Sequence, residues 1–162
     1  MRHILPIETD RVRGSVMDFE SVFSAVGLLA MLGWLTLVIS PLIPIWSDRI
    51  AGLIVPVLLA ATYVAFLLLV PSENGGGFGS FAEVKQLFTN PGAVMAGWIH
   101  FLAFDLLIGA WICRTARREH IPFWMALPCL PATFLFGPAG FLLFTAVRGI
   151  KRMTGPAAPT AA

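Results

Sequence analysis

An imidazole and a carboxyl group lie near the centre of one long apolar stretch of this chain. His100 and Asp105 belong to the run Trp-Ile-His-Phe-Leu-Ala-Phe-Asp at 98–105, which has apolar residues on both sides. An ionisable side chain at membrane depth costs about 3 kcal/mol on insertion scales, so such residues usually face a bundle interior and mark functional sites. His100 and Asp105 are therefore the first candidates for chemistry in this sequence.

Each candidate has a chemical role that suits its type. An imidazole exchanges protons near neutral pH, so His100 is the predicted base. A carboxyl group buried alone is neutral or needs a cation, for which Arg114 and Arg148 are the candidates. A neutral buried carboxylic acid can donate a hydrogen bond, so Asp105 is the predicted acid. Glu83 could reach the mouth of a cavity as a third catalytic residue, or it could only cap a helix.

Helical geometry limits how His100 and Asp105 can act together. They are five residues apart, which in a helix is about 140° around and roughly 7.5 Å along the axis. They cannot form a direct pair within one helix. They could flank one cavity in the membrane, or each could be a hydrogen-bonding contact to a different helix with no catalytic role.

The composition identifies the elements that must position these residues. The chain is 57% hydrophobic and 12% charged, with a mean hydropathy of +0.83. Soluble domains carry about 25% charged residues, so this is a membrane protein. A helix needs about 20 apolar residues to cross a bilayer. Four stretches approach this length and predict an all-α, polytopic bundle of four transmembrane helices, at 22–40, 50–70, 93–113 and 123–147.

These spans divide the chain into a polar N-terminal segment, a four-helix membrane domain and a disordered C-terminal tail, at 1–20, 21–148 and 149–162. Four spans would place both termini on one side of the membrane. That side would carry seven of the eleven basic residues, so the positive-inside rule favours cytoplasmic termini.

Two segments outside the long spans have turn and breaker signals. Glycines dominate 73–80, and the apolar spacing of 81–88 predicts a short amphipathic helix at the membrane interface, with Ser80 as its N-cap. The fourth span contains Pro128, Pro131 and Pro138, which remove helical hydrogen bonds. A break there could open a pocket beside the third span, or the prolines could only curve the helix.

Several function classes are excluded. The net charge is +2 and no basic stripe with interleaved aromatic residues is present, so no nucleic-acid partner is expected. Cys113 and Cys129 lack metal-site spacing. His100 is the only histidine within a predicted span, whereas bis-histidine haem ligation needs two. We therefore expect no metal and no cofactor.

Aromatic side chains are abundant around the candidate residues. Five tryptophans and thirteen phenylalanines suit a long conjugated or isoprenoid ligand, although ordinary packing explains them equally well. The predicted substrate-binding residues are Trp98, Phe101, Phe104 and Pro138.

Four runs of the sequence resemble one small membrane family, the plant neoxanthin synthase (abscisic-acid-deficient-type) proteins and their bacterial relatives. The runs are Gly-Gly-Phe-Gly-Ser at 76–80, Leu-Phe-Thr-Asn-Pro at 87–91, Trp-Ile-His-Phe-Leu-Ala-Phe-Asp-Leu at 98–106 and Phe-Gly-Pro-Ala-Gly at 136–140. The resemblance covers about 19–148 and all four predicted spans. The segment 117–122 is similar to the bacterial branch, which implies a bacterial inner membrane.

The resemblance implies a membrane protein of carotenoid metabolism. Plant members are linked to the isomerisation of an epoxy-xanthophyll to an allenic product, which needs no redox cofactor. The predicted function is thus a cofactor-independent isomerase acting on a carotenoid or other isoprenoid lipid, as a possible homodimer or part of a larger complex. The alternatives are a non-catalytic pigment-binding or assembly subunit, and a small-solute transporter or channel.

Overall fold

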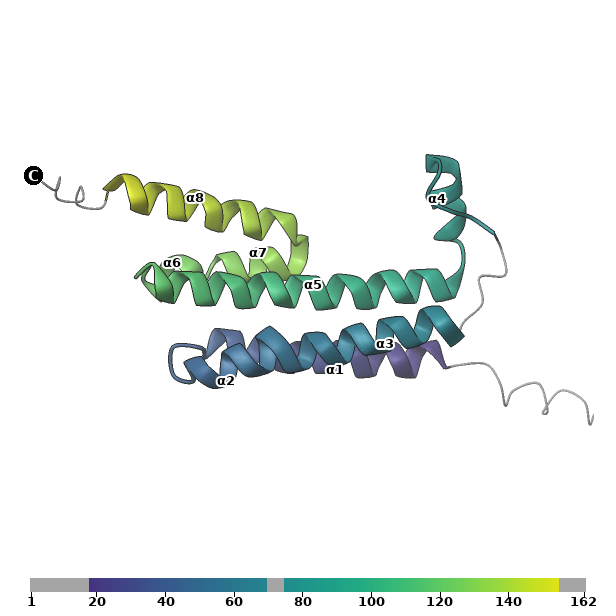
Figure 1. Ribbon diagram of the computed structural model, residues 1–162, viewed down its shortest axis with the longest axis horizontal. Coiled ribbons are helices and arrows are strands. Elements are labelled where there is room, and N and C mark those ends of the chain that lie inside the picture. The colour runs from purple at the N-terminus through teal and green to yellow at the C-terminus, as the bar shows by residue number, and fades with distance from the viewer. Residues whose placement is uncertain (1–17, 70–74, 155–162) are drawn as a thin grey trace, which may run out of the picture.

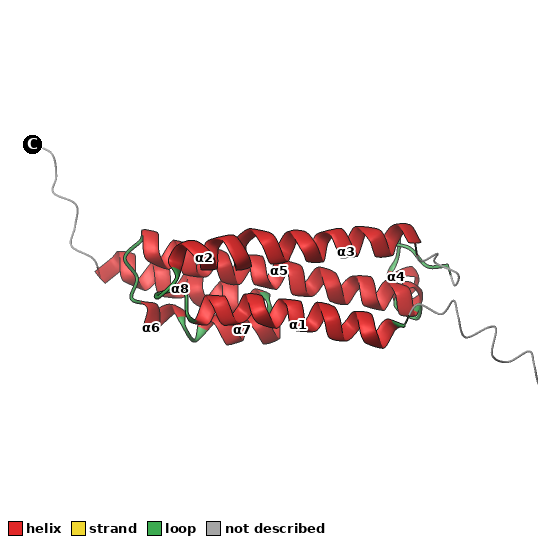
Figure 2. Cartoon of the chain, turned by 90° about the horizontal axis from the view of Figure 1, so that it is seen from below, coloured by secondary structure: helices red, strands yellow, loops and turns green. Residues whose placement is uncertain are grey.

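A computed structural model describes residues 18–69 and 75–154 of this chain, and within them it is built from helices with no strand (Figure 2). This confirms the predicted all-α class. Among the described residues, three helices are long and apolar enough to cross a membrane, at Phe19–Val38, Pro44–Leu69 and Pro91–Arg118. The chain is therefore a polytopic membrane protein.

The first two membrane-crossing helices form an antiparallel pair. Helix α1 (Phe19–Val38) ends before Pro41, and the chain turns back at Pro44 into a continuous helical rod. This rod consists of α2 (Pro44–Arg49), the π-helical segment η2 (Ile50–Ile54) and α3 (Val55–Leu69). Pro56 has no N–H to donate to Gly52, and a wider π-helical turn relieves the clash of its ring with that carbonyl.

A short helix precedes the longest one. Helix α4 (Phe81–Leu87) is N-capped by Ser80, as predicted, and Asn90 caps α5 (Pro91–Arg118) through hydrogen bonds accepted from Gly92 and Ala93. Pro91 occupies the first position of α5, where its missing N–H costs nothing.

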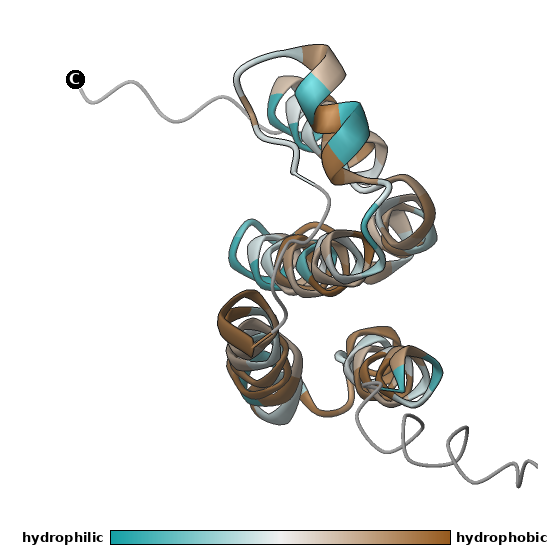
Figure 3. Ribbon diagram, turned by 90° about the vertical axis from the view of Figure 1, so that its right-hand side faces the viewer, coloured by the Kyte–Doolittle hydropathy of each residue, from teal (hydrophilic) through white to brown (hydrophobic). Residues whose placement is uncertain are grey.

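Helix α5 is the centre of the fold. Figures 1 and 3 place it between the α1/α3 pair on one side and α7 and α8 on the other. Its inward positions are buried, including Ile99, Leu106, Ala110 and Ile112 at 0% exposure. Most residues of the surrounding helices are hydrophobic (brown in Figure 3), and many of their large apolar side chains are exposed, as expected for helices that face lipid.

The fourth predicted span is not a single crossing helix, so the count of four spans is not confirmed. Its residues form α6 (Phe123–Ala126), α7 (Cys129–Phe136) and α8 (Pro138–Thr154). Helix α7 runs back along α5, and the chain reverses at Gly137 about halfway along α5 (Figure 1). The helix is broken before Pro138, as one of the two alternatives expected, and the result is a helical hairpin that covers half of α5 rather than a curved span.

Glycine makes this reversal possible at two positions. Gly137 has a φ of +44°, a conformation that side-chain-bearing residues rarely adopt, and its N–H donates to the carbonyl of Thr133 over 2.7 Å. Pro138 then starts α8. Gly140 packs so closely on Thr133 that a Cβ atom there would overlap that residue. The two arms of the hairpin therefore touch through a glycine.

The hairpin changes the topology that four spans would give. Helix α1 begins and α8 ends at opposite ends of the bundle (Figure 1), so the described residues do not support termini on one side. Residues 149–154, expected in the C-terminal tail, form the last turns of α8, whereas 155–162 and most of the N-terminal segment lie outside the described residues.

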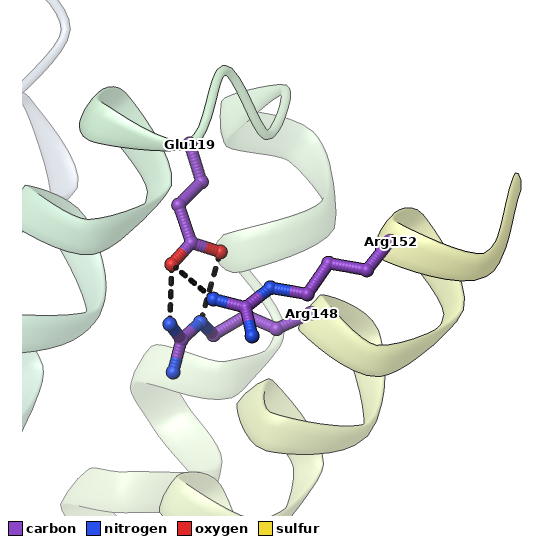
Figure 4. Close-up of polar contacts among 3 residues, drawn as sticks. All are labelled: Glu119, Arg148 and Arg152. Atoms are coloured by element: carbon purple, nitrogen blue, oxygen red, sulfur yellow. Dashed lines mark hydrogen bonds and ion pairs between the residues drawn. The ribbon is translucent and has the colours of Figure 1, made fainter. Parts of the chain in front are cut away.

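An ion-pair cluster fastens α8 to the end of α5. Arg148 binds Glu119 through two nitrogens, with its Nε 3.0 Å from Oε2, and Nη2 of Arg152 lies 3.0 Å from Oε1 (Figure 4). The guanidinium of Arg148 also lies 5.5 Å from the centre of the Trp111 ring, a cation–π contact with α5. The hydrogen bonds and positive charge of Arg148, and to a lesser extent those of Arg152, hold the pKa of Glu119 below its usual range.

We expect Gly140→Ala to destabilise the hairpin by about 1–3 kcal/mol, because the new Cβ overlaps Thr133. The matched control is Gly149→Ala in the same helix, where a Cβ meets nothing within 4 Å. The control should be neutral or stabilise by up to about 1 kcal/mol through helix propensity. Thermal unfolding of the detergent-purified protein measures both, and equal midpoints for the two variants would contradict the hairpin packing.

We also expect the Glu119 cluster to stabilise the protein at neutral pH and to lose its effect in acid. The pKa of Glu119 is lower in the folded than in the unfolded state. The cluster therefore contributes its full share of the free energy of unfolding above the unfolded-state pKa, and this contribution disappears as the pH falls through the folded-state pKa. Glu119→Gln should therefore lower the unfolding midpoint at about pH 7, and the difference from the unmodified protein should shrink towards about pH 3. A pH-independent difference would argue against this account.

Candidate functional site

Asp105 lies in the middle of α5 and faces the tip of the α7–α8 hairpin. It is only 6% exposed, and its Oδ2 is buried without a hydrogen-bond partner among the described residues. A Cβ on Gly137 would lie 2.8 Å from Oδ1 of Asp105, so the glycine leaves the space that the carboxyl group occupies. The structure thus places a carboxyl group with an unused oxygen beside the chain reversal.

Neither arginine proposed as a partner of Asp105 reaches it. Arg114 lies beside Asp48, and Arg148 binds Glu119. Both arginines are near the end of the bundle, whereas Asp105 is half a helix away from it. Within the described residues, Asp105 therefore has no ion-pair partner.

His100 lies on a different face of α5. It is exposed, its ring stacks on Phe104 at a centroid distance of 4.5 Å, and the ring of Tyr63 on α3 is 5.8 Å away. Phe104 is itself 54% exposed. The structure therefore brings His100 together with Phe104 and Tyr63, and it does not bring His100 to Asp105.

Two of the predicted substrate-binding residues belong to an aromatic stack between α1 and α5. Trp98 stacks on Phe23 at 5.4 Å and on Phe101 at 5.6 Å, with 25° between the ring planes in both pairs. Phe101 precedes Asp105 by four residues, so the stack leads along the same face of α5 towards the carboxyl group. Phe23 was not predicted from the sequence, because its pairing depends on how α1 packs.

A cavity of about 390 Å³ adjoins this stack. Its lining comes from the start of α1, the turn before α5 and the first turns of α5: Phe19, Phe23, Thr89, Pro91, Val94, Met95 and Trp98. A second cavity, of about 180 Å³, lies between α1 and the α6–α7 segment, beside the edge-to-face pair of Trp34 and Phe134. Both cavities are lined almost entirely by apolar atoms and suit an apolar ligand.

Pro138 and Glu83 have clear structural positions. Pro138 is the exposed first residue of α8 at the hairpin tip. Glu83 is exposed on α4, where its N–H donates to Oγ of Ser80 over 3.2 Å and its Oε2 accepts from the N–H of Gly79 over 3.0 Å. These bonds fit the capping alternative for Glu83.

The described residues contain no group of three or more histidine, cysteine or acidic side chains that could hold a metal ion. What the arrangement offers chemically is one buried carboxyl group, one exposed imidazole on another face, and flat aromatic rings between apolar helices.

Comparison with known proteins identifies one family. The sequence matches the family described as ABA DEFICIENT 4-like over residues 21–144, well over half of the chain. This range contains α3, α4, α5 and most of the hairpin. No curated protein and no solved structure matches the chain.

Proposed function

Because the chain belongs to the ABA DEFICIENT 4-like family, we propose that it binds an oxygenated carotenoid or related isoprenoid along α5 and isomerises its end group. The family and the apolar helices make it a membrane protein of carotenoid metabolism. What we propose beyond this is the substrate, the reaction and the catalytic residues.

One observation carries the proposal: the buried, unpartnered carboxyl oxygen of Asp105 at the hairpin tip. An unsatisfied polar atom at this depth is costly unless a ligand or water completes it. The hydroxyl or epoxide oxygen of an isoprenoid end group has the right chemistry. A neutral carboxyl group can donate to that oxygen, and a carboxylate can accept from a hydroxyl.

The aromatic stack supports a conjugated ligand in particular. Trp98 stacks between Phe23 and Phe101, with 25° between the planes of each pair, and Phe23 and Trp98 line the cavity of about 390 Å³. A polyene chain can lie against such rings and the cavity wall, with its end group directed towards Asp105 one helical turn beyond Phe101.

The proposed reaction gives one proton to the substrate and removes another, so the product is an isomer, and exchange with water carries the base's proton back to Asp105. Asp105 gives its proton to an epoxide oxygen, the C–O bond breaks, and a base removes a proton from a nearby carbon to form the allenic alcohol. Asp105 is the acid in this proposal, and His100 is the proposed base. Since these two residues lie on different faces of α5, their roles require separate tests.

Pigment binding without conversion is the second candidate function. The separation of exposed His100 from buried Asp105 favours it, because an acid and a base that act on one end group should both reach it. In that case the aromatic stack holds the pigment, and Asp105 orients its oxygen.

We further propose that the bundle end formed by α2, α6 and the last turns of α5 and α8 faces the cytoplasm, in a bacterial inner membrane. Seven of the eleven basic residues belong to this end. The positive-inside rule then places α1's first residue on the opposite side. A reporter that fluoresces only when it folds in the cytoplasm should be bright when fused after Ala162 and dark when fused before Met1. The reverse pattern would overturn this orientation.

The catalytic proposal is tested by pigment profiles from a host that makes epoxy- and hydroxy-carotenoids. The unmodified chain should give a new isomer, and Asp105→Asn should lower its amount about 10²–10⁴-fold, because the amide cannot act as the acid. Membrane levels and helical content of the variant serve as the folding control.

A His100→Ala variant provides the second arm of the same experiment. Reduced turnover in this variant would support the base role, and normal turnover would remove it while leaving Asp105 as the acid. An unchanged product level in Asp105→Asn would overturn the acid role. Co-purified pigment with no conversion by the unmodified protein would favour the binding function.

A further inference from the structure

The charge of the described residues is divided unequally between the two ends of the bundle. The basic end is formed by α2, α6 and the last turns of α5 and α8 (Figure 1). It carries seven bases and two acids, namely Arg49, Arg114, Arg117, Arg118, Arg148, Lys151 and Arg152 with Asp48 and Glu119. The opposite end carries three acids and one base, Asp18, Glu20, Glu83 and Lys85.

One carboxylate at the basic end is shared by two arginines. Oδ1 of Asp48 lies 2.5 Å from Nη2 of Arg117 and 3.7 Å from Nε of Arg114, so only Arg117 is within hydrogen-bonding distance. Nε of Arg114 and Nη1 of Arg117 have no hydrogen-bond partner among the described residues. Both nitrogens are buried, so what the cluster offers to molecules outside the protein is one net positive charge. The Glu119 cluster likewise has two arginines for one carboxylate.

The fold holds Arg114 in place at this end. A Cβ on Gly52 would lie 2.6 Å from Nη2 of Arg114. The guanidinium group of Arg114 therefore packs against the π-helical segment η2 at Gly52, which has no side chain to block it. The side chains of Arg114 and Arg117 remain 39% and 31% exposed. Molecules outside the protein can therefore reach both.

Three further cations at the basic end are not compensated. Arg49, Arg118 and Lys151 form no ion pair with any residue that the structure describes. The guanidinium of Arg49 lies 5.6 Å from the ring centre of exposed Trp46. Tryptophans are enriched at the level of lipid headgroups, and exposed Trp46 and Trp124 both belong to this end. These two tryptophans favour headgroup depth for the neighbouring cations.

We propose that the basic end binds the phosphate groups of anionic phospholipids in the leaflet that it faces. Guanidinium groups form charge-assisted hydrogen bonds with phosphate oxygens, and juxtamembrane cations are attracted to anionic leaflets. The Arg114–Asp48–Arg117 cluster supplies one uncompensated positive charge. Arg49, Arg118 and Lys151 supply further charge and donors that no ion pair within the described residues uses. This inference is independent of the carotenoid reaction.

The test compares lipid retention by the full chain and two variants. The proteins are extracted from vesicles of equal phosphatidylglycerol and phosphatidylcholine in about 0.1 M salt, and bound lipids are counted by native mass spectrometry. The first variant combines Arg49→Gln, Arg118→Gln and Lys151→Gln, which leaves every ion pair intact. Its preference for phosphatidylglycerol should fall about fivefold for each charge removed. Lys85→Gln at the opposite end is the matched control and should retain the preference.

Salt and free phosphate distinguish the sources of the anion. Retention of phosphatidylglycerol should decrease in about 1 M sodium chloride, because salt screens exposed charges. Unchanged retention in the triple variant, or an equal loss in Lys85→Gln, would overturn the proposal. Displacement of the lipid by millimolar inorganic phosphate would also overturn it, since the site would then be one for soluble anions.

Discussion

Every backbone N–H and C=O group at membrane depth needs a hydrogen-bond partner, and this requirement governs the structure. A chain that reverses direction in hydrocarbon has few partners to offer these groups. At the hairpin tip, the N–H of Gly137 donates to Thr133 and the N–H of Gly140 donates to Gly137 over 3.1 Å. The tip is also covered by α5, where Asp105 lies against Gly137. A reversal is tolerated here because Gly137 and Gly140 are buried and their N–H groups are bonded, although Pro138 between them is exposed. The position of α8, and with it the Glu119 cluster, depends on this turn.

The central position of α5 gives its different faces different environments. On the face that carries Trp98 and Asp105, Trp98 meets Phe23 of α1 and Asp105 meets the hairpin. The face with His100 lies beside Tyr63 on α3 and is exposed. Side chains five residues apart on one helix, such as His100 and Asp105, point in different directions. Because α5 has neighbours on several sides, each of the two side chains meets a different one. The same helix continues past the apolar region and delivers its last arginines to the basic end. One helix therefore links the mid-membrane carboxyl group to the membrane surface.

Part of the candidate site followed from the sequence. A buried carboxyl group in an apolar helix, the Ser80 cap and the break near Pro138 are local properties of residue type and spacing. The stack of Phe23 on Trp98, the contact of Asp105 with Gly137 and the exposure of His100 depend on which helices are neighbours. A helical wheel gives directions around one helix, but it does not say what lies in each direction.

The amino-acid sequence alone made this an all-helical membrane protein, because its composition is 57% hydrophobic and its apolar runs are long. Within a bilayer, the N–H and C=O groups of such runs can pair only with one another. The sequence also identified the family, through runs of specific residues. The number of crossings was decided only by tertiary structure. A stretch of 25 residues from Phe123 to Val147 is long enough to span a bilayer, and it folds back instead because Gly137 adopts a positive φ and Gly140 lets the two arms touch.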